Sequence, residues 1–254
     1  MNAASQAPKI AMVLAAGLGT RMRPLTDDRP KALVEVGGKA LIDHMLDRLA
    51  AAGVETAVVN VHYFADRLEQ HLVRRAETHP LPHIVISDER PQALETGGGV
   101  KHALPLLGED PIWVANIDSV WIEDASAIEA VARAWDPARM DVCLMLASTT
   151  ESLGFHDTGD VFLGEEDSHG GVVRFKDPGE TAPLVYVGVH ICKPQVVADG
   201  PEGPFSLLPI WKALAKDHRV HGVAPQGVWM HVGDPGARDV AEARLAKHSE
   251  VGRS

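Results

Sequence analysis

A short segment near the start of the chain combines a glycine loop with fixed positive charge. Gly17 and Gly19 follow an apolar stretch, residues 10–16, that we expect to form a strand. Glycine lets the backbone amides of such a loop turn toward an anion, and Arg21 and Lys31 add cations beside it. Two glycines alone would equally suit a tight turn, but a turn has no use for the cations. The segment therefore predicts a cradle for phosphate groups.

The loop matches neither of the two common glycine-rich nucleotide motifs. The dinucleotide fingerprint requires a third glycine three residues after Gly19, where Met22 stands. A P-loop requires Gly-Lys followed by Ser or Thr, and no such run follows. The spacing therefore argues against both of those nucleotide-binding classes.

A carboxylate follows a second apolar stretch. Residues 112–117 are typical of a buried strand, with Asn116 near its end and Asp118 directly after it. Ligands of open α/β sheets bind outside the carboxyl ends of the strands, and nucleotidyl transfer uses Mg²⁺ held by few carboxylates together with phosphate oxygens. Asp118 is therefore a candidate magnesium ligand, and the alternative is a carboxylate that caps the next segment.

A glycine-rich stretch, residues 92–99, precedes a helix expected at 97–107. Its glycines would let the backbone approach a flat base closely. The alternative is an ordinary loop in which Thr96 caps the helix.

Strand-like and helix-like stretches alternate through the first part of the chain. The expected strands lie at 10–16, 56–62, 83–87, 112–117 and 141–148, and the expected helices at 42–52, 64–76, 97–107 and 124–135. Farther along we expect a β-hairpin over the sheet (160–163 with 172–175), strands at 186–192 and 220–223, and helices at 205–216 and 234–246. The alternation predicts an α/β, Rossmann-like, mostly parallel sheet flanked by helices.

Composition limits the classes of protein. The chain has 254 residues, of which 45% are hydrophobic and 23% charged, as expected of a folded domain. A net charge of -11 argues against a nucleic-acid partner. Residues 1–9 lack the apolar core of a signal peptide and residues 10–16 are too short to span a bilayer, so we expect a cytoplasmic protein without a membrane partner. Cys143 and Cys192 lie in apolar runs and are expected to be buried free thiols.

Residues 14–31 resemble the signature of the nucleoside-diphosphate-sugar pyrophosphorylases, Leu-x-x-Gly-x-Gly-Thr-Arg-x-x-Pro-x-Thr with a following Pro-Lys. That family joins a nucleoside triphosphate to a sugar 1-phosphate and releases pyrophosphate. The resemblance implies the nucleotide-diphospho-sugar transferase fold, with a small β-hairpin in its sugar-binding region. It also implies one domain over residues 1–254, with a nucleotide-binding part at about 9–120 and a sugar-binding part at about 121–233.

The same resemblance implies roles for individual residues. Arg21, Lys31 and Asp118 would be the catalytic residues, with Asp118 as a ligand of Mg²⁺. The implied nucleotide-binding residues are Leu14, Ala15, Gly17, Gly19, Thr20, Arg21, Lys31, Gln92, Thr96 and Gly97. The implied sugar-binding residues are Asn116, Asp160, Lys176 and Gly188, although a solubilising lysine and a packing glycine are the alternatives for the last two.

The largest departure from the family pattern is at position 231. The family has Trp-x-Asp-x-Gly, in which the aspartate is a second metal ligand, and here His231 takes its place after Trp229. Imidazole is a poor ligand for Mg²⁺ but an acceptable one for Mn²⁺ or Co²⁺. His231 therefore indicates a changed metal, a reduced activity, or a side chain that only packs beside the site.

The resemblance leaves several functions open. The sequence of residues 94–99, Leu-Glu-Thr-Gly-Gly-Gly, is similar to a form in this family that favours uridylyl transfer from UTP to N-acetylmuramate 1-phosphate, a step of peptidoglycan recycling, over guanylyl transfer to mannose 1-phosphate. A cytidylyltransferase for phosphocholine, or a catalytically weak homologue that serves as a binding or regulatory subunit, are further alternatives. We expect a nucleoside triphosphate and a sugar 1-phosphate as partners, and a monomer or small homo-oligomer.

Overall fold

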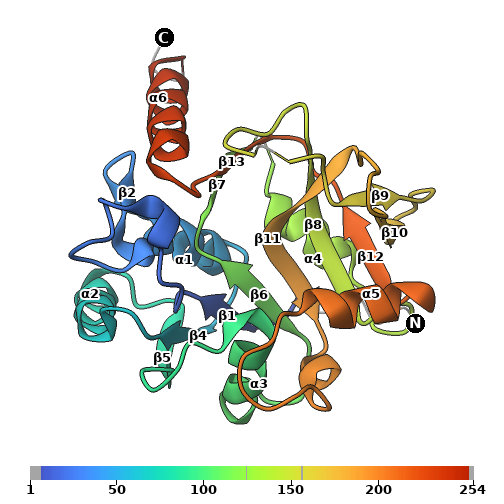
Figure 1. Cartoon of the computed structure of the whole chain (residues 1–254), viewed down its shortest axis with the longest axis horizontal. Coiled ribbons are helices and arrows are strands. Elements are labelled where there is room, and N and C mark those ends of the chain that lie inside the picture. Colours follow the sequence, from blue (N-terminus) through green and yellow to red (C-terminus); the bar gives the residue numbers. More distant parts are fainter. Residues whose placement is uncertain (1–6, 124, 156, 252–254) are drawn as a thin grey trace.

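The computed structural model describes residues 7–123, 125–155 and 157–251. A nine-stranded sheet runs through the molecule in the order β5-β4-β1-β6-β11-β8-β12-β10-β9 (Figure 1). Its strands are β1 (Ile10–Leu14), β4 (Thr56–Val61), β5 (His83–Asp88), β6 (Ile112–Asn116), β8 (Val142–Ser148), β9 (Val161–Leu163), β10 (Gly171–Phe175), β11 (Leu184–Cys192) and β12 (Val220–Val223). The expected α/β fold, a mostly parallel sheet flanked by helices, is confirmed.

The two halves of the sheet differ in strand direction. Strands β5, β4, β1 and β6 are parallel to one another. Strand β11 lies between β6 and β8 and is antiparallel to both, whereas β12 is parallel to β8. The hairpin of β9 and β10 forms as expected, but β10 pairs with β12, so the hairpin extends the edge of the sheet and does not lie over it.

Helices cover both faces of the sheet. They are α1 (Leu41–Ala51), α2 (Ala65–Thr78), α3 (Glu95–Leu107), α4 (Ala127–Ala134), α5 (Leu208–Lys216) and α6 (Pro235–Val251). Helices α1, α2 and α4 share one hydrophobic core, and α3 and α5 share the other. Successive strand residues point to opposite faces, so Ala11 and Val13 of β1 enter the first core and Met12 enters the second.

Helix α1 shows how the sequence determines these boundaries. Its buried side chains, including Ile42, Met45 and Leu49, recur at helical spacing along one face. It ends at Ala51, one residue before the expected end, and the expected capping residue Gly53 adopts φ +83°. The amide of Gly53 donates to the carbonyl of Ala50 and that of Val54 to the carbonyl of Leu49, which satisfies the last carbonyls of the helix.

Other boundaries differ from expectation. Helix α4 begins at Ala127, where the Ser126 hydroxyl accepts the amide of Glu129, and Asp124, the expected start, lies outside the described residues. Helix α3 begins two residues before Gly97, and α5 begins at Leu208 because the preceding residues form a loop.

Several short elements had no counterpart in the sequence prediction. Strands β7 (Ser119–Ile122) and β13 (Val228–His231) form an antiparallel pair outside the main sheet, as do β2 (Glu35–Val36) and β3 (Lys39–Ala40). Single 3-10 turns are η1 (Thr20–Met22), η2 (Lys31–Leu33) and η3 (Pro194–Val197). The β7–β13 pair joins segments that are far apart in sequence, and the other elements are only two to four residues long, so local periodicity carries little information about them.

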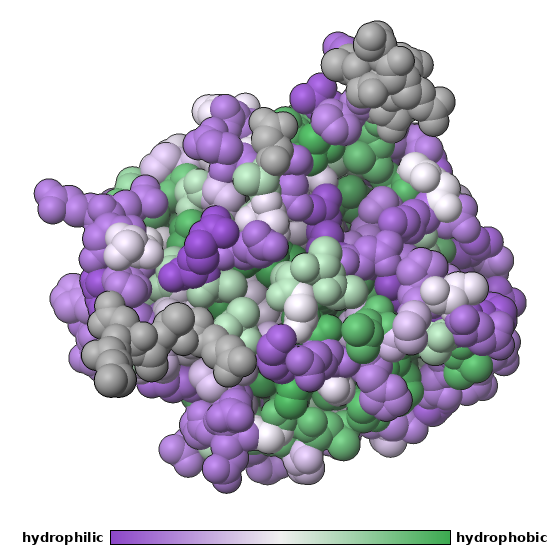
Figure 2. Space-filling model, turned by 180° about the vertical axis from the view of Figure 1, so that it is seen from behind, coloured by the Kyte–Doolittle hydropathy of each residue, from purple (hydrophilic) through white to green (hydrophobic). Residues whose placement is uncertain are grey.

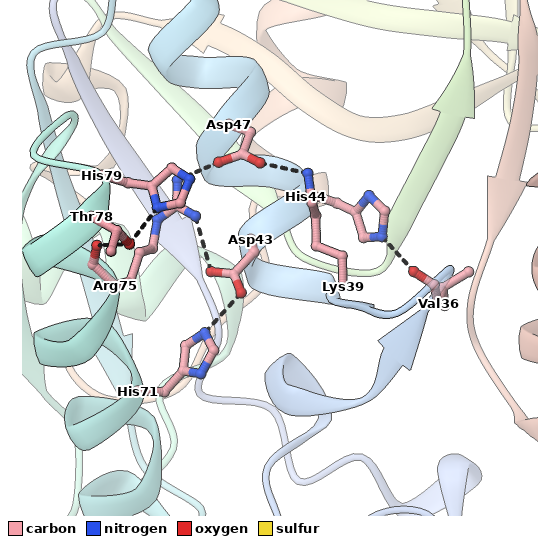
Figure 3. Close-up of polar contacts among 9 residues, drawn as sticks. All are labelled: Val36, Lys39, Asp43, His44, Asp47, His71, Arg75, Thr78 and His79. Carbon is pink, nitrogen blue, oxygen red and sulfur yellow. Dashed lines mark hydrogen bonds and ion pairs between the residues drawn. The ribbon is translucent and has the colours of Figure 1, made fainter. Parts of the chain in front are cut away.

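A buried ionic network joins α1 to α2 (Figure 3). The Arg75 side chain, only 6% exposed, lies between Asp43 and Asp47 and donates to both. His71 Nε2 lies 2.8 Å from Asp43 Oδ2, and Lys39 Nζ lies 2.6 Å from Asp47 Oδ2. The network satisfies the buried guanidinium and fixes the relative position of the two helices.

A second ionic cluster joins the residue before β8, the residue after β11 and the residue before β12. Asp141, which precedes β8, accepts from Lys193 Nζ at 2.7 Å and from Arg219 Nη2 at 2.8 Å. The Arg219 hydrogen bonds, together with Lys193, hold the pKa of Asp141 down to about 2.

None of the helices in the described part of the chain is both long and apolar enough to cross a bilayer. Hydrophilic side chains dominate the rim seen from behind, and hydrophobic ones show between them (Figure 2). Cys143 and Cys192 are buried free thiols as expected, and burial raises the pKa of each to about 12.

Candidate functional site

A cavity of about 720 Å³ lies at the carboxyl ends of β1, β4 and β6; we call it the nucleotide cavity. Its lining comes from the glycine loop, the start of η2, the ends of β4 and β6, and the start of α3. The lining residues include Leu14, Ala15, Gly17, Gly19, Thr20, Arg21, Lys31, Asn60, Glu89, Thr96, Asn116 and Asp118. Parallel strands bring these segments to one edge of the sheet, as the sequence predicted.

The two loop glycines serve different purposes. Gly19 adopts φ +61°, and an added Cβ would lie 3.0 Å from Thr26 Cγ2 and 3.1 Å from Lys31 Cβ. The Thr26 hydroxyl donates to the Gly19 carbonyl at 2.8 Å, which holds this conformation. An added Cβ at Gly17 would meet nothing within 4 Å, so Gly17 leaves open space on the cavity side. Gly19 is therefore required by the turn, and Gly17 leaves room for a ligand.

The cations of the loop have different partners. Arg23 is exposed and lies 3.6 Å from Asp27, outside the lining of the cavity. Arg21 lines the cavity, and within the described chain its guanidinium has no hydrogen bond or ion pair. Lys31 Nζ lies 2.8 Å from Asp118 Oδ2, with only 12% and 21% of the two side chains exposed. One cation is thus free for an anion, and the other is paired with the candidate metal ligand.

The charge state of Asp118 follows from these neighbours. Burial acts to raise the pKa of Asp118, but the nearby Lys31 and His231 outweigh burial, and the pKa lies below its usual value. The carboxylate is therefore ionised at neutral pH, as a metal ligand must be.

Two residues that the sequence analysis missed hold the cavity together. Asn60 Oδ1 accepts the amides of Ala15 and Ala16 at 2.6 and 3.1 Å, and Asn60 Nδ2 donates to Glu89 Oε1 at 2.8 Å. Glu89 Oε2 accepts the amide of Leu94 at 3.1 Å. Asn60 and Glu89 are each 2% exposed. The pair thus ties the glycine loop to β4 and to the start of α3, and the position of both residues at strand ends was the available signal.

The glycine-rich stretch before α3 is only partly at the cavity. Gln92 is exposed and outside its lining. The amide of Gly97 donates to the Phe205 carbonyl at 2.8 Å, and an added Cβ there would lie 2.4 Å from the Phe205 ring. Gly97 therefore serves close packing, and its amide is already occupied. Thr96 does line the cavity, but its hydroxyl accepts the amide of Leu207 and does not cap the helix.

The implied sugar-binding residues lie around two further cavities. A small one of about 140 Å³, the Asp118 cavity, is lined by Asn116, Asp118, Asp160, Gly188 and His231 among others. Gly188 adopts φ +86°, and an added Cβ would lie 3.0 Å from Asn116 Cβ. A larger one of about 580 Å³, the α5 cavity, is lined by Asp160, Lys176 and the start of α5. All four residues therefore lie next to the nucleotide cavity or one cavity away from it.

Hydrogen bonds hold two of these side chains. Asp160 Oδ2 accepts the amide of Tyr186 at 3.0 Å, and burial raises the pKa of Asp160. Lys176 Nζ donates to Thr158 Oγ1 at 2.7 Å.

His231 reaches the site through the β7–β13 pair. It lies opposite Ser119 in that pair, and the next amide, of Val232, donates to the carbonyl of Asp118 at 2.8 Å. Burial lowers the pKa of His231, so the ring is neutral at neutral pH. Asp234, three residues farther along, is outside the linings of the nucleotide cavity and the Asp118 cavity, and its Oδ1 accepts the amide of Ala237 at the start of α6. No group of three or more metal-binding side chains occurs in the described residues.

The fold and the site define a nucleotidyltransferase, and comparison with known proteins agrees. The chain belongs to the MobA-like NTP transferase family, whose model matches residues 11–191. It is 77% identical over 244 residues to the N-acetylmuramate alpha-1-phosphate uridylyltransferase of Caulobacter vibrioides, covering 96% of this chain and 99% of that protein. The enzyme of the same name from Neisseria meningitidis is 36% identical, covering 88% of this chain and 92% of that protein. The resemblance inferred from the glycine-loop signature is thereby confirmed.

Solved structures show the same fold at low sequence identity. A UDP-glucose pyrophosphorylase from Acinetobacter baumanii superposes with a TM-score of 0.76 at 19% identity, covering 93% of each chain. The arrangement of the sheet and its helices is therefore shared with this enzyme, and the protein is a sugar-1-phosphate nucleotidyltransferase by family.

Proposed function

We propose that the protein transfers a uridylyl group from UTP to N-acetylmuramate 1-phosphate, forming UDP-N-acetylmuramate and pyrophosphate. One observation carries the reaction: the glycine loop, the Lys31–Asp118 pair and an Arg21 that has no partner among the described residues meet on a single cavity at the carboxyl ends of the strands. The choice of substrates is supported by 77% identity to the uridylyltransferase of that name. Such an enzyme would act in the cytoplasm, where UTP is available.

The proposed chemistry is an in-line displacement. An oxygen of the sugar 1-phosphate attacks the α-phosphorus of UTP, and the bond from that phosphorus to the bridging oxygen of pyrophosphate breaks. Both reactants are anions, so catalysis consists of positioning them and neutralising their charge, without a covalent enzyme intermediate. Arg21 would stabilise the departing pyrophosphate, and Lys31 would bridge the α-phosphate and the attacking phosphate.

The residues present fit a divalent cation that is held jointly by protein and substrate. Asp118 offers an ionised carboxylate on the nucleotide cavity, and neutral His231 lies on the neighbouring Asp118 cavity. A hard cation such as Mg²⁺ takes one or two protein ligands and completes its shell with phosphate oxygens and water. We infer Mg²⁺, with Mn²⁺ or Co²⁺ as alternatives favoured by the imidazole. The cation would neutralise the phosphates during transfer.

Pyrophosphate release tests the reaction and its substrates together. We would measure it for UTP, GTP, CTP and ATP, each combined with N-acetylmuramate, N-acetylglucosamine, glucose and mannose 1-phosphates. We expect the highest kcat/KM for UTP with N-acetylmuramate 1-phosphate. A higher value for GTP with mannose 1-phosphate would replace the proposal with guanylyl transfer, and no turnover in any combination would favour a binding or regulatory role.

The metal is tested separately. Turnover should vanish in excess chelator and return with added Mg²⁺, and it should be lost in Asp118→Asn, which keeps the shape of the side chain without its charge. Full activity of either the chelated enzyme or the variant would rule out Asp118 as a metal ligand.

A further inference from the structure

The α5 cavity continues the catalytic site on the acceptor side. Thr96 lines both this cavity and the nucleotide cavity, and Asp160 and Tyr186 line both this cavity and the Asp118 cavity. The three cavities therefore adjoin one another. A sugar 1-phosphate whose phosphate lies near Asp118 would extend its substituents into the α5 cavity.

The walls of the α5 cavity suit a substituted sugar. One wall is the loop after β10, residues 176–181, and another is the beginning of α5. Phe175, Tyr186 and Trp211 contribute aromatic surface, and a few polar groups stand among them, as is typical of small-molecule sites. At about 580 Å³ the cavity is about four times the 140 Å³ of the Asp118 cavity, so it has room for more than a bare ring.

One cation in the α5 cavity has no partner. The charged lining residues are Asp160, Lys176, Asp177, Glu180 and Lys212. Lys176 is held by Thr158 Oγ1 at 2.7 Å and lies 3.6 Å from Asp157 Oδ1. Lys212, on the first turns of α5, makes no hydrogen bond or ion pair within the described residues. Besides three carboxyl groups and the hydrogen-bonded Lys176, the cavity is thus lined by Lys212, which has no partner among the described residues and can bind a ligand.

We propose that Lys212 binds a carboxylate carried by the acceptor sugar, an inference that rests on the proposed function. N-acetylmuramate differs from N-acetylglucosamine by a lactyl ether on the ring, which ends in a carboxylate. Glu180 is paired with Arg174 at 2.7 Å, but Asp160 and Asp177 also line the cavity and disfavour an anionic group unless a cation meets it. A sugar without the lactyl arm gains nothing from Lys212, so this lysine selects between the two sugars.

The test compares two acceptors in two variants. Lys212→Met keeps most of the apolar stem and removes the charge, and Lys216→Met is the matched control, one turn farther along α5 and outside the lining of the cavity. With UTP fixed, we measure kcat/KM for N-acetylmuramate 1-phosphate and for N-acetylglucosamine 1-phosphate. A charge-assisted hydrogen bond of ordinary strength predicts a loss of about tenfold to a hundredfold for the first acceptor only. Lys216→Met should leave both values unchanged.

The outcomes separate this inference from the proposed function. If wild type turns over N-acetylmuramate 1-phosphate but Lys212→Met lowers kcat/KM equally for both acceptors, or for neither, the carboxylate site is refuted and the proposed function stands. If wild type prefers an acceptor without a carboxylate, both fail. Thermal melting of each variant shows whether a loss reflects unfolding, and Lys212→Arg, which retains the charge, should then keep most of the preference.

Discussion

The hydrogen-bonded pair of Asn60 and Glu89 allows a prediction in which two damaging substitutions repair each other. Asn60 donates to one oxygen of Glu89, and the other oxygen accepts the amide of Leu94. Asn60→Asp replaces the donor with an oxygen 2.8 Å from a second carboxylate. Glu89→Gln instead provides one acceptor for two donors. Each single change leaves one buried contact unsatisfied, which costs about 1 to 3 kcal/mol of the free energy of unfolding.

The double variant Asn60→Asp/Glu89→Gln reverses the direction of the bond. The new amide at position 89 donates to the new carboxylate at position 60, and its oxygen still accepts the amide of Leu94. The other oxygen at position 60 still accepts the amides of Ala15 and Ala16. Since the pair again carries one carboxylate and satisfied donors, we expect the double variant to recover about 1 to 2 kcal/mol relative to the sum of the single changes.

Urea unfolding and calorimetric titration with UTP measure the two consequences. Asn60 holds the glycine loop through hydrogen bonds to the amides of Ala15 and Ala16. Each single variant should therefore weaken UTP binding by about tenfold, which corresponds to about 1.4 kcal/mol, and the double variant should restore most of the lost affinity. Additive losses in the double variant would refute the reversal of the bond. Restored stability without restored UTP binding would show that Asn60 and Glu89 support the fold and not the loop.

Three further predictions follow from individual contacts. Arg21→Ala and Lys31→Ala should each lower kcat by about 10²- to 10³-fold with unchanged circular dichroism, whereas Arg23→Ala, which removes a cation outside the cavity, should change it little; near-normal turnover of the first two would refute the phosphate cradle. His231→Asp should raise the apparent affinity for Mg²⁺ in titrations of turnover, since a carboxylate suits Mg²⁺ better than imidazole, and superimposable Mg²⁺ and Mn²⁺ curves for both proteins would place His231 outside the metal shell. Asp141→Asn should lower the free energy of unfolding by about 1 to 2 kcal/mol at pH 7, because the pKa of Asp141 in the folded protein, about 2, lies below its value in the unfolded chain. This stabilisation by the carboxylate is complete above about pH 4 and is lost as the pH falls toward 2. An equal difference between wild type and variant at pH 7 and pH 3 in urea unfolding would contradict this reasoning.

The chemistry-bearing residues could be found in the sequence because they follow apolar strands. Gly17 and Gly19 follow β1 within a few residues, and Asp118 follows β6 in the same way; parallel neighbours bring such ends to one edge of the sheet. Lys31 was placed correctly at the same cavity because it belongs to the glycine-loop signature. Its contact with Asp118 joins residues 87 positions apart and needed the structure.

Other features left no distinct trace in the residue pattern. Strand β11 is as apolar as a parallel strand would be, so its antiparallel direction between β6 and β8 could not be seen. The sequence shows a glycine at position 97 but not whether it makes room for a ligand or, as the structure has it, for the ring of Phe205. Asn60 and Glu89 stand at strand ends like Asp118, but each acts through hydrogen bonds to distant backbone that only the folded chain brings near.

Because β13 is the last strand in the chain, one wall of the site is made late during synthesis. Strands β1, β4, β5 and β6 all lie before residue 117, so the parallel half of the sheet is available to an unfinished chain on the ribosome. The amide that closes on the Asp118 carbonyl belongs to Val232, and β7 finds its partner only when residues 228–231 have emerged. In a growing chain the glycine loop is therefore made long before the β7–β13 pair beside Asp118 can form. The wall beside Asp118 is completed only by this long-range pairing, after every strand of the main sheet has been made.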